Sequence, residues 1–287
     1  MKKFNNIVVG LDISKTSISV LQRAFLLAKE SDAKVTIVHA INTSWFTELF
    51  SSSNLEELQT QTRKNIEEII ELIDTKDIEY SILIDKESAS TLVVETAKKL
   101  DACLIIIGAN DKENKDITLL GSTAHKIAQN SKMPIIIVKS DSVKEYNNIV
   151  SFSDLSEISY ASLKFAKDFF KKDAIQTIYV YNQMSELTLK YYNKFDQKDK
   201  IHTDIQNKEK EKLNIFSDTY NVKEIEAIET EAGVSSALLS YAETHKPDLI
   251  VLGSKGVNNT SAFLYGSTTS YLMENLTNDL LIYVPEQ

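Results

Sequence analysis

Glycine, proline and cysteine are all scarce in this sequence. Only seven glycines and three prolines occur among 287 residues, so most of the chain is predicted to lie in regular helices and strands. The single cysteine, Cys103, excludes an intrachain disulfide, and its apolar neighbourhood ACLIIIG predicts a buried strand. None of the four histidines has a second histidine or cysteine at ligand spacing, so we expect no metal site.

Positive charge and long apolar runs are also lacking. A formal net charge of -9 argues against nucleic acid or an anionic membrane as the main partner, because both would repel the chain at long range. No apolar run approaches the roughly 20 residues of a membrane span, and the run in MKKFNNIVVGLD is too short for a signal peptide. We therefore expect a cytoplasmic protein. Because there is no G-x-S-x-G nucleophile motif, the sequence indicates no catalytic residue.

The chain contains an internal duplication. Residues 5–14, NNIVVGLDIS, return at 147–156 as NNIVSFSDLS, and DACLIIIGANDKENKDITLLGST at 101–123 matches PDLIVLGSKGVNNTSAFLYGST at 247–268. The polar segment SDSVKEY, which lacks apolar periodicity, separates the copies. The sequence therefore predicts two domains, residues 1–140 and 147–287.

Each copy alternates short apolar runs with helical patterns, which is typical of a parallel α/β sheet. The expected strands are 6–11, 34–40, 80–84, 103–108 and 135–139 in the first copy, and about 147–152, 175–181, 224–228, 248–253 and 280–284 in the second. A long charged helix is expected at about 196–220. The predicted fold is α/β: two tandem Rossmann-like domains, each a five-stranded parallel sheet with helices on both faces.

The segment 248–269, DLIVLGSKGVNNTSAFLYGSTT, has the strongest functional pattern. An apolar strand ends at Gly253, Gly256 follows, and a helix begins in the run GSTT at 266–269. Backbone N–H groups and the positive end of a helix dipole gather in such a loop, which suits a phosphate chain. Neither the P-loop pattern nor the Rossmann G-x-G-x-x-G pattern is present.

The spacing of these glycines, Gly-x-x-Gly, nine residues, then Gly-Ser, resembles the motif of ATP-binding members of the universal stress protein family. The resemblance covers nearly the whole chain, twice, and implies that Asp154 and Val180 contact the nucleoside while the glycine loop holds phosphates. In a doubly wound sheet the residues that follow strands one, two and four converge at one crevice. The predicted nucleotide-binding residues are Asp154, Val180, Leu252, Gly253, Lys255, Gly256, Gly266, Ser267, Thr268 and Thr269.

The first copy departs from this motif at two positions. Asp111 stands where the second copy has Gly256, and Ala124 stands where it has Thr269. A carboxylate near a phosphate chain costs roughly 1 kcal/mol at 4 Å in water and about 4 kcal/mol at an effective dielectric constant near 20. We therefore expect the first copy to hold no ATP. For Asp154 an alternative role is open, namely the N-cap of a helix that begins at about Glu157.

The leading hypothesis is a tandem universal stress protein that binds ATP or a related adenine nucleotide, with or without Mg²⁺, in its second domain. It is expected to act in stress response as a nucleotide-dependent regulatory or binding module, through its conformation or an unknown protein partner. The alternatives are a slow ATP hydrolase or phosphotransferase, and a nucleotide-independent scaffold. The apolar fifth strands, which form sheet edges in this family, are expected to pair within the chain as an intramolecular pseudo-dimer, with homodimerisation open. The tyrosine-rich segment 184–195 is expected to pack on a neighbouring domain.

Overall fold

Two similar series of strands and helices make up the structure, a computed structural model that describes residues 4–14, 16–41, 52–75, 77–109, 121–254 and 265–285. The first half contains β1 (Asn6–Gly10), α1 (Ser17–Ser31), β2 (Lys34–Ala40), α2 (Ser52–Ile70), β3 (Tyr80–Asp85), α3 (Ala89–Lys99), β4 (Leu104–Gly108), α4 (Ser122–Asn130) and β5 (Ile135–Val138). The second half contains β6 (Ile149–Ser153), α5 (Glu157–Phe170), β7 (Gln176–Asn182), α6 (Glu186–Tyr191), the 3-10 turn η1 (Phe195–Gln197), α7 (Lys198–Tyr220), β8 (Ile225–Thr230), α8 (Val234–His245), β9 (Leu249–Gly253), α9 (Ser267–Asn275) and β10 (Asp279–Tyr283).

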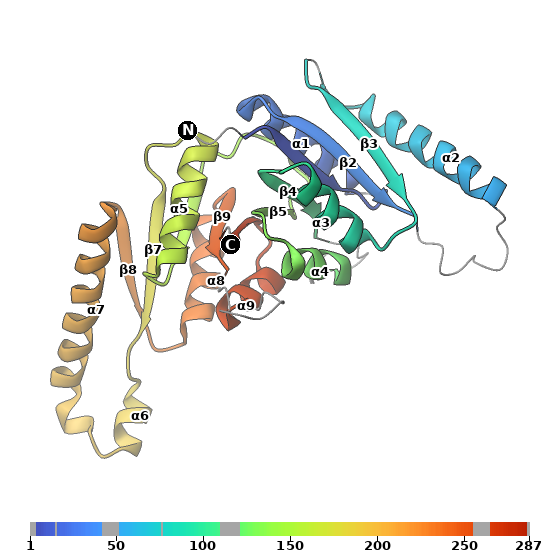
Figure 1. Ribbon diagram of the computed structural model, residues 1–287. Helices are drawn as coiled ribbons and strands as arrows, with labels where there is room; N and C mark the ends of the chain where they lie inside the picture. Colours follow the sequence, from blue (N-terminus) through green and yellow to red (C-terminus); the bar gives the residue numbers. More distant parts are fainter. Residues whose placement is uncertain are drawn as a thin grey trace.

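All of these strands lie in one continuous sheet, in the order β3-β2-β1-β4-β5-β10-β9-β6-β7-β8 (Figure 1). Neighbouring strands are parallel except at the centre, where β5 and β10 pair antiparallel with Ile136 opposite Leu281. Both strands are buried and apolar, and their pairing removes the open sheet edge that each half would otherwise present. The tandem α/β prediction is confirmed, and so is the pairing of the two fifth strands, which merges the two expected sheets into one.

Two layers of helices cover the sheet because side chains alternate between its faces. Ile7 and Val9 of β1 point into a core covered by α1, α2, α5 and α7, whereas Val8 points into one covered by α3, α4, α8 and α9. Cys103 packs at the edge of the first core, half-buried rather than fully buried as expected. Within the described residues, no helix is long and apolar enough to cross a membrane.

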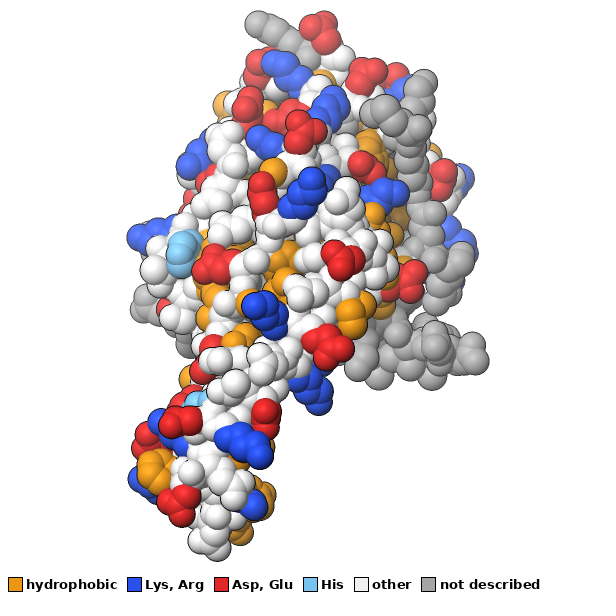
Figure 2. Space-filling view, turned by 90° about the vertical axis from the view of Figure 1, so that its left-hand side faces the viewer, with side chains coloured by type: hydrophobic (Ala, Val, Ile, Leu, Met, Phe, Trp, Pro, Cys, Tyr) orange, Lys and Arg blue, Asp and Glu red, His pale blue; other side chains and the backbone are white. Residues whose placement is uncertain are grey.

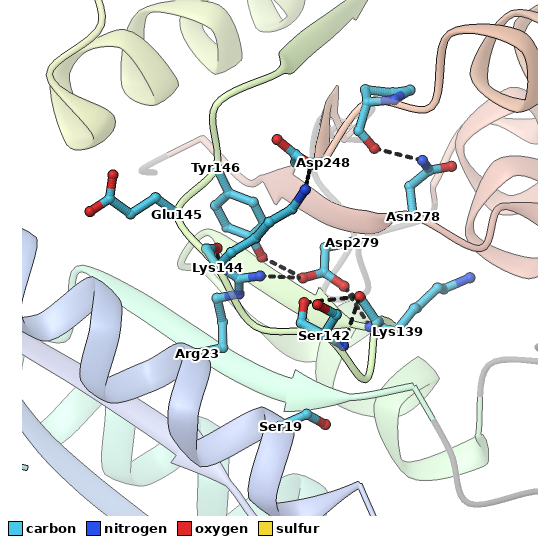
Figure 3. Close-up of polar contacts among 12 residues, drawn as sticks. Ser19, Arg23, Lys139, Ser142, Lys144, Glu145, Tyr146, Asp248, Asn278 and Asp279 are labelled. Atoms are coloured by element: carbon cyan, nitrogen blue, oxygen red, sulfur yellow. Dashed lines mark hydrogen bonds and ion pairs between the residues drawn. The ribbon is translucent and has the colours of Figure 1, made fainter. Parts of the chain in front are cut away.

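A buried polar cluster fastens the junction between the two halves (Figure 3). Asp279, at the start of β10, accepts hydrogen bonds through Oδ1 from the backbone N–H groups of Lys139 (2.8 Å) and Ser140 (2.9 Å). Its Oδ2 accepts a hydrogen bond of 2.6 Å from the Tyr146 hydroxyl and lies 3.4 Å from the Arg23 guanidinium. One carboxylate therefore ties α1, the end of β5 and the interdomain linker to the second half.

The segment between β7 and β8 projects from the body as an arm, residues 183–220, made of α6, η1 and α7 (Figure 1, lower left). The short helix α6 was not predicted from the sequence. The expectation that the tyrosines here pack on a neighbouring domain is wrong, since Tyr191 and Tyr192 are 81% and 65% exposed. The second half of α7 lies against the body: Phe216 is buried in the core, and Gln206 donates a hydrogen bond to Glu229 of β8.

Candidate functional site

A cavity of about 440 Å³ opens beyond the carboxyl ends of β6, β7 and β9, beside the first turn of α9. This is where a doubly wound sheet binds its ligands. Every predicted binding residue that the structure describes lines this cavity: Asp154, Val180, Leu252, Gly253, Gly266, Ser267, Thr268 and Thr269. Lys255 and Gly256, together with Asp111 of the first copy, lie outside the described residues.

The first turn of α9 provides backbone donors at the cavity. Gly266 is the N-cap residue, so no side chain caps the helix, and the first turn contains no acidic residue. The first N–H groups of an α-helix have no partner within the helix, and the helix dipole makes this end partly positive. Ser267 and Thr268 extend the polar lining. This end of the cavity therefore suits an anion such as a phosphate.

Thr269 and Gly253 fix the position of α9 and β9 rather than simply facing a ligand. The buried Thr269 hydroxyl donates a hydrogen bond of 3.2 Å to the carbonyl oxygen of Gly253. A Cβ atom at Gly253 would lie 3.0 Å from Cγ2 of Ile158 and 3.3 Å from its carbonyl oxygen. Gly253 therefore lets α5 approach β9 closely, a packing role that sequence reasoning missed.

Asp154 lies at the exposed mouth of the cavity, in the turn between β6 and α5. Its Oδ1 accepts a hydrogen bond of 3.0 Å from the backbone N–H of Ser156. Ser156 is itself the N-cap, because its hydroxyl oxygen accepts a hydrogen bond from the N–H of Ser159. The alternative that Asp154 caps this helix is therefore wrong. Its Oδ2 has no partner among the described residues and remains available to a ligand.

Tyr179 and Val180 line the cavity from the middle of β7 rather than from its end. The Tyr179 hydroxyl donates a hydrogen bond of 2.5 Å to Oε2 of Glu209 on α7. Burial, together with this hydrogen bond, raises the pKa of Tyr179, so the hydroxyl keeps its proton and remains a donor. Sequence reasoning named Val180 but missed Tyr179, whose buried side chain connects the cavity wall to the arm.

Ser254 is a second residue that sequence reasoning missed. It lines the cavity and is almost fully buried, yet its hydroxyl has no hydrogen-bond partner among the residues that the structure describes. Nearly all buried polar groups are paired, so an unpaired hydroxyl in a cavity wall indicates a position for a polar atom of a ligand. The detectable signal was the substitution between copies, because the first copy has Ala109 at this position.

The equivalent cavity of the first half is smaller, about 260 Å³, and lies beyond β1, β2 and β4. Asp12, Ala40 and the first turn of α4 line it, as their counterparts do in the second half. Ala109 and Ala124 replace the two hydroxyl-bearing residues, so this cavity has fewer polar groups. Small-molecule sites are commonly about 300–1,000 Å³, a range that includes only the larger of these two cavities. Among the described residues no group of three His, Cys, Asp or Glu residues is placed to hold a metal ion.

Known proteins resemble both halves of the chain. The sequence profile of the Universal stress protein family matches residues 3–139 and 145–284. Universal stress protein MJ0531 of Methanocaldococcus jannaschii is 27% identical over 140 residues, which are 47% of this chain and 82% of that protein. Universal stress protein YxiE of Bacillus subtilis is 27% identical over 147 residues, 47% of this chain and 99% of that protein.

A solved structure extends the likeness to the whole fold. The crystal structure of a universal stress protein from Archaeoglobus fulgidus superposes with a TM-score of 0.68 at 17% identity, covering 98% of this chain and 99% of that chain. At this identity the likeness concerns the fold alone. Because the family profile matches both halves almost completely, this chain belongs to the universal stress protein family and contains two of its domains in tandem.

Proposed function

We propose that the chain binds ATP, or a related adenine nucleotide, in the cavity of its second domain and acts in the cytoplasm as a nucleotide-dependent regulatory or binding module in stress response. The observation that carries this proposal is the convergence of three distant segments, from β7 and from the turns after β6 and β9, on one cavity next to an uncapped helix N-terminus. Such convergence is what nucleotide recognition requires, since base, ribose and phosphates need different partners.

The residues present fit an adenine nucleotide. The Oδ2 of Asp154, which has no partner among the described residues, can accept a hydrogen bond from the nucleoside, and Val180 lines the same cavity. The N–H groups that begin α9 suit the phosphates, and the Ser254 hydroxyl offers a further donor. The protein would thus bind and orient the nucleotide. A partner protein could then recognise the nucleotide-bound state through the negative charge of the phosphates.

The first domain is proposed to hold no ATP. Its cavity is smaller, it lacks the hydroxyl of Ser254, and Asp111 puts a negative charge into its glycine loop. Mutual repulsion between this carboxylate and phosphate oxygens corresponds to about one to three powers of ten in affinity. The duplication therefore leaves one nucleotide site per chain.

Isothermal titration of ATP with Mg²⁺ into the full chain tests the proposal, once copurified nucleotide has been removed and its absence checked by absorbance. We expect one site in the wild type and at least about tenfold weaker binding in Asp154→Ala, the loss of one charge-assisted hydrogen bond. The matched variant Asp12→Ala, at the equivalent position of the first domain, should bind like the wild type. The absence of heat in the wild type would refute ATP binding and favour the nucleotide-independent scaffold.

The asymmetry of the domains has its own test. Gly256→Asp should abolish the single site, and Asp111→Gly should add binding in the first domain if the carboxylate is the main obstacle there. Two sites in the wild type would contradict the asymmetry while leaving ATP binding intact. Measurement of phosphate release with Mg²⁺ on the same samples separates the alternatives, because steady release indicates a hydrolase and retention of ATP indicates a binding module.

A further inference from the structure

The end of the arm exposes a cluster of large apolar side chains, here called the arm tip: Met184, Leu187, Tyr191, Tyr192 and Phe195. Leu187 is 80% exposed, and the two tyrosines are exposed almost as fully. Figure 2 shows hydrophobic side chains interspersed with charged ones at the end of the arm, away from the body of the molecule. At up to about 200 Å² for each fully exposed side chain, the arm tip presents on the order of 600 Å². Soluble monomers rarely expose a larger patch, so the tip indicates an interaction surface.

The side chains of the arm tip contact one another in a defined arrangement. Leu187 and Tyr191 are one helical turn apart on α6 and therefore share a face. The rings of Tyr191 and Tyr192 meet edge to face with centroids 5.1 Å apart. The Lys190 ammonium lies 4.7 Å from the centroid of the Phe195 ring, which joins η1 to α6. Beneath them Leu189 is buried as a small core of the tip.

Hydrogen bonds and ion pairs hold the arm in one shape. The His202 ring on α7 is hydrogen-bonded to the Met184 carbonyl oxygen at 2.9 Å, and Lys198 pairs with Glu186 at 2.7 Å. Nearer the body, Tyr179 of β7 is bonded to α7, as described above. A surface that is already ordered loses little conformational entropy when it binds, so the tip is prepared for association.

Electrostatics opposes contact between the bodies of two copies but leaves the arm tip free for such a contact. The chain carries a net charge of -9, so two copies repel each other wherever their bodies meet. Residues 184–200 contain four lysines and three acidic residues, a local charge of +1, and the arm keeps this region away from the acidic body. The exposed edge of β5 is already consumed within the chain by its pairing with β10. We propose that the arm tip is the interface of a two-fold symmetric dimer of this chain.

The area and the symmetry of this contact define what should be observed. Tip packed on tip would bury about 1,200 Å² in total, the lower limit for a stable specific interface, so we expect a weak dimer that dissociates on dilution. A contact of the same patch with itself closes after two copies. If the tip of one copy docked on the body of another copy instead, each complex would still have one free tip and one free body surface, so further copies would add and form open-ended oligomers. The expected species is thus a dimer and nothing larger.

Sedimentation velocity of the full chain, from about 1 to 100 µM, measures this equilibrium. We expect a monomer–dimer equilibrium whose dissociation constant rises at least about thirtyfold in the double variant Leu187→Ser/Tyr191→Ser, because apolar side chains at the centre of an interface carry most of its binding energy. The matched control is Leu72→Ser, a leucine 70% exposed beyond the end of α2 in the first domain, which should leave the equilibrium unchanged. Circular dichroism checks that both variants are folded.

Each other outcome overturns the proposal. A chain that stays monomeric at 100 µM has no such interface. A dimer that survives Leu187→Ser/Tyr191→Ser, or that Leu72→Ser weakens as strongly, is formed elsewhere. Salt adds an independent readout, since screening the repulsion between two acidic bodies should strengthen a contact made by apolar side chains. Dissociation at high salt would show that ion pairs rather than the arm tip hold the copies together. The proposal does not depend on nucleotide binding.

Discussion

Asp279→Asn removes the negative charge that faces Arg23 at the junction of the two domains. Arg23 is buried, with its guanidinium 3.7 Å above the centre of the Tyr146 ring and bonded to the Lys144 carbonyl oxygen at 2.6 Å. In the variant the buried cation loses its ion-pair partner, and the amide that replaces the carboxylate cannot accept all of its hydrogen bonds. Breaking a buried ion pair by removing one partner costs about 3–5 kcal/mol.

Differential scanning calorimetry provides the measurement. For a chain of this size 1 kcal/mol corresponds to about 2–4 °C, so Asp279→Asn should lower the melting temperature on the order of 10 °C. The matched control is Asp248→Asn. Asp248 lies in the same region but pairs with Lys144, whose side chain is 68% exposed, at 3.4 Å. Asp248 is 18% exposed, and the hydrogen bonds that it accepts from the backbone N–H groups of Asn147 and Asn148 can be kept by an asparagine oxygen. A pair with one exposed partner contributes about 0–1 kcal/mol, so this control should shift the melting temperature by only a few degrees.

A double variant separates the ion pair from general damage to the junction. Arg23→Met/Asp279→Asn leaves no uncompensated charge, so its cost should be clearly below the sum of the costs of the two single variants. The reasoning is refuted if Asp279→Asn melts as high as Asp248→Asn. It is equally refuted if the two single costs simply add, because the charges would then not interact.

Three further predictions concern single residues. Burial lowers the pKa of Lys139 from an ordinary 10.5 to about 8, so between these two pH values only the unfolded chain keeps the proton and the contribution of Lys139 to stability rises with pH. The melting temperature of the wild type relative to that of Lys139→Met should therefore increase from pH 7.5 to 9.5. No such change is expected relative to Lys126→Met, which alters an exposed lysine. Gly253→Ala should cost about 1–3 kcal/mol in thermal unfolding through its clash with Ile158, and Ile158→Ala should relieve only part of it because backbone contacts at 3.3 Å remain. Ser254→Ala should leave the melting temperature unchanged but weaken ATP binding by up to about tenfold; a large loss of stability would show that the hydroxyl already serves the fold.

The fold could be predicted from the sequence because its signals are local and repeated. Apolar runs such as Leu104–Gly108 and helical patterns such as Ser17–Ser31 recur in both copies, so each copy supports the interpretation of the other. Helix α6 escaped detection for a physical reason. It has six residues, and Leu187 and Tyr191 form its exposed face, so it has no apolar stripe directed at the body.

The candidate site was predictable where topology alone decides it. Asp154 follows β6 and Val180 lies within the neighbouring β7, and parallel strands bring their carboxyl ends to one edge of the sheet. The roles of Ser254, Tyr179 and Gly253 were not predictable, because each depends on a partner that is distant in the sequence or missing. Ser254 is buried without a partner, Tyr179 is bonded to a helix of the arm, and Gly253 is approached closely by α5. These are tertiary contacts, which no local sequence pattern encodes.

The junction also explains why the two fifth strands pair within one chain. In the duplication Arg23 corresponds to Phe165, and Asp279 corresponds to Pro134. One flank of the junction is therefore ionic, with Arg23 paired to Asp279. On the other flank Phe165 packs on Tyr283 with ring centroids 5.7 Å apart. Were β5 to pair with β5 of another copy, Arg23 would face Pro134 and remain buried without a carboxylate, at a cost of several kcal/mol. Such a penalty against the wrong partner produces specificity as effectively as a favourable contact with the right one. The divergence of the two copies at this junction therefore commits β5 to β10 of its own chain.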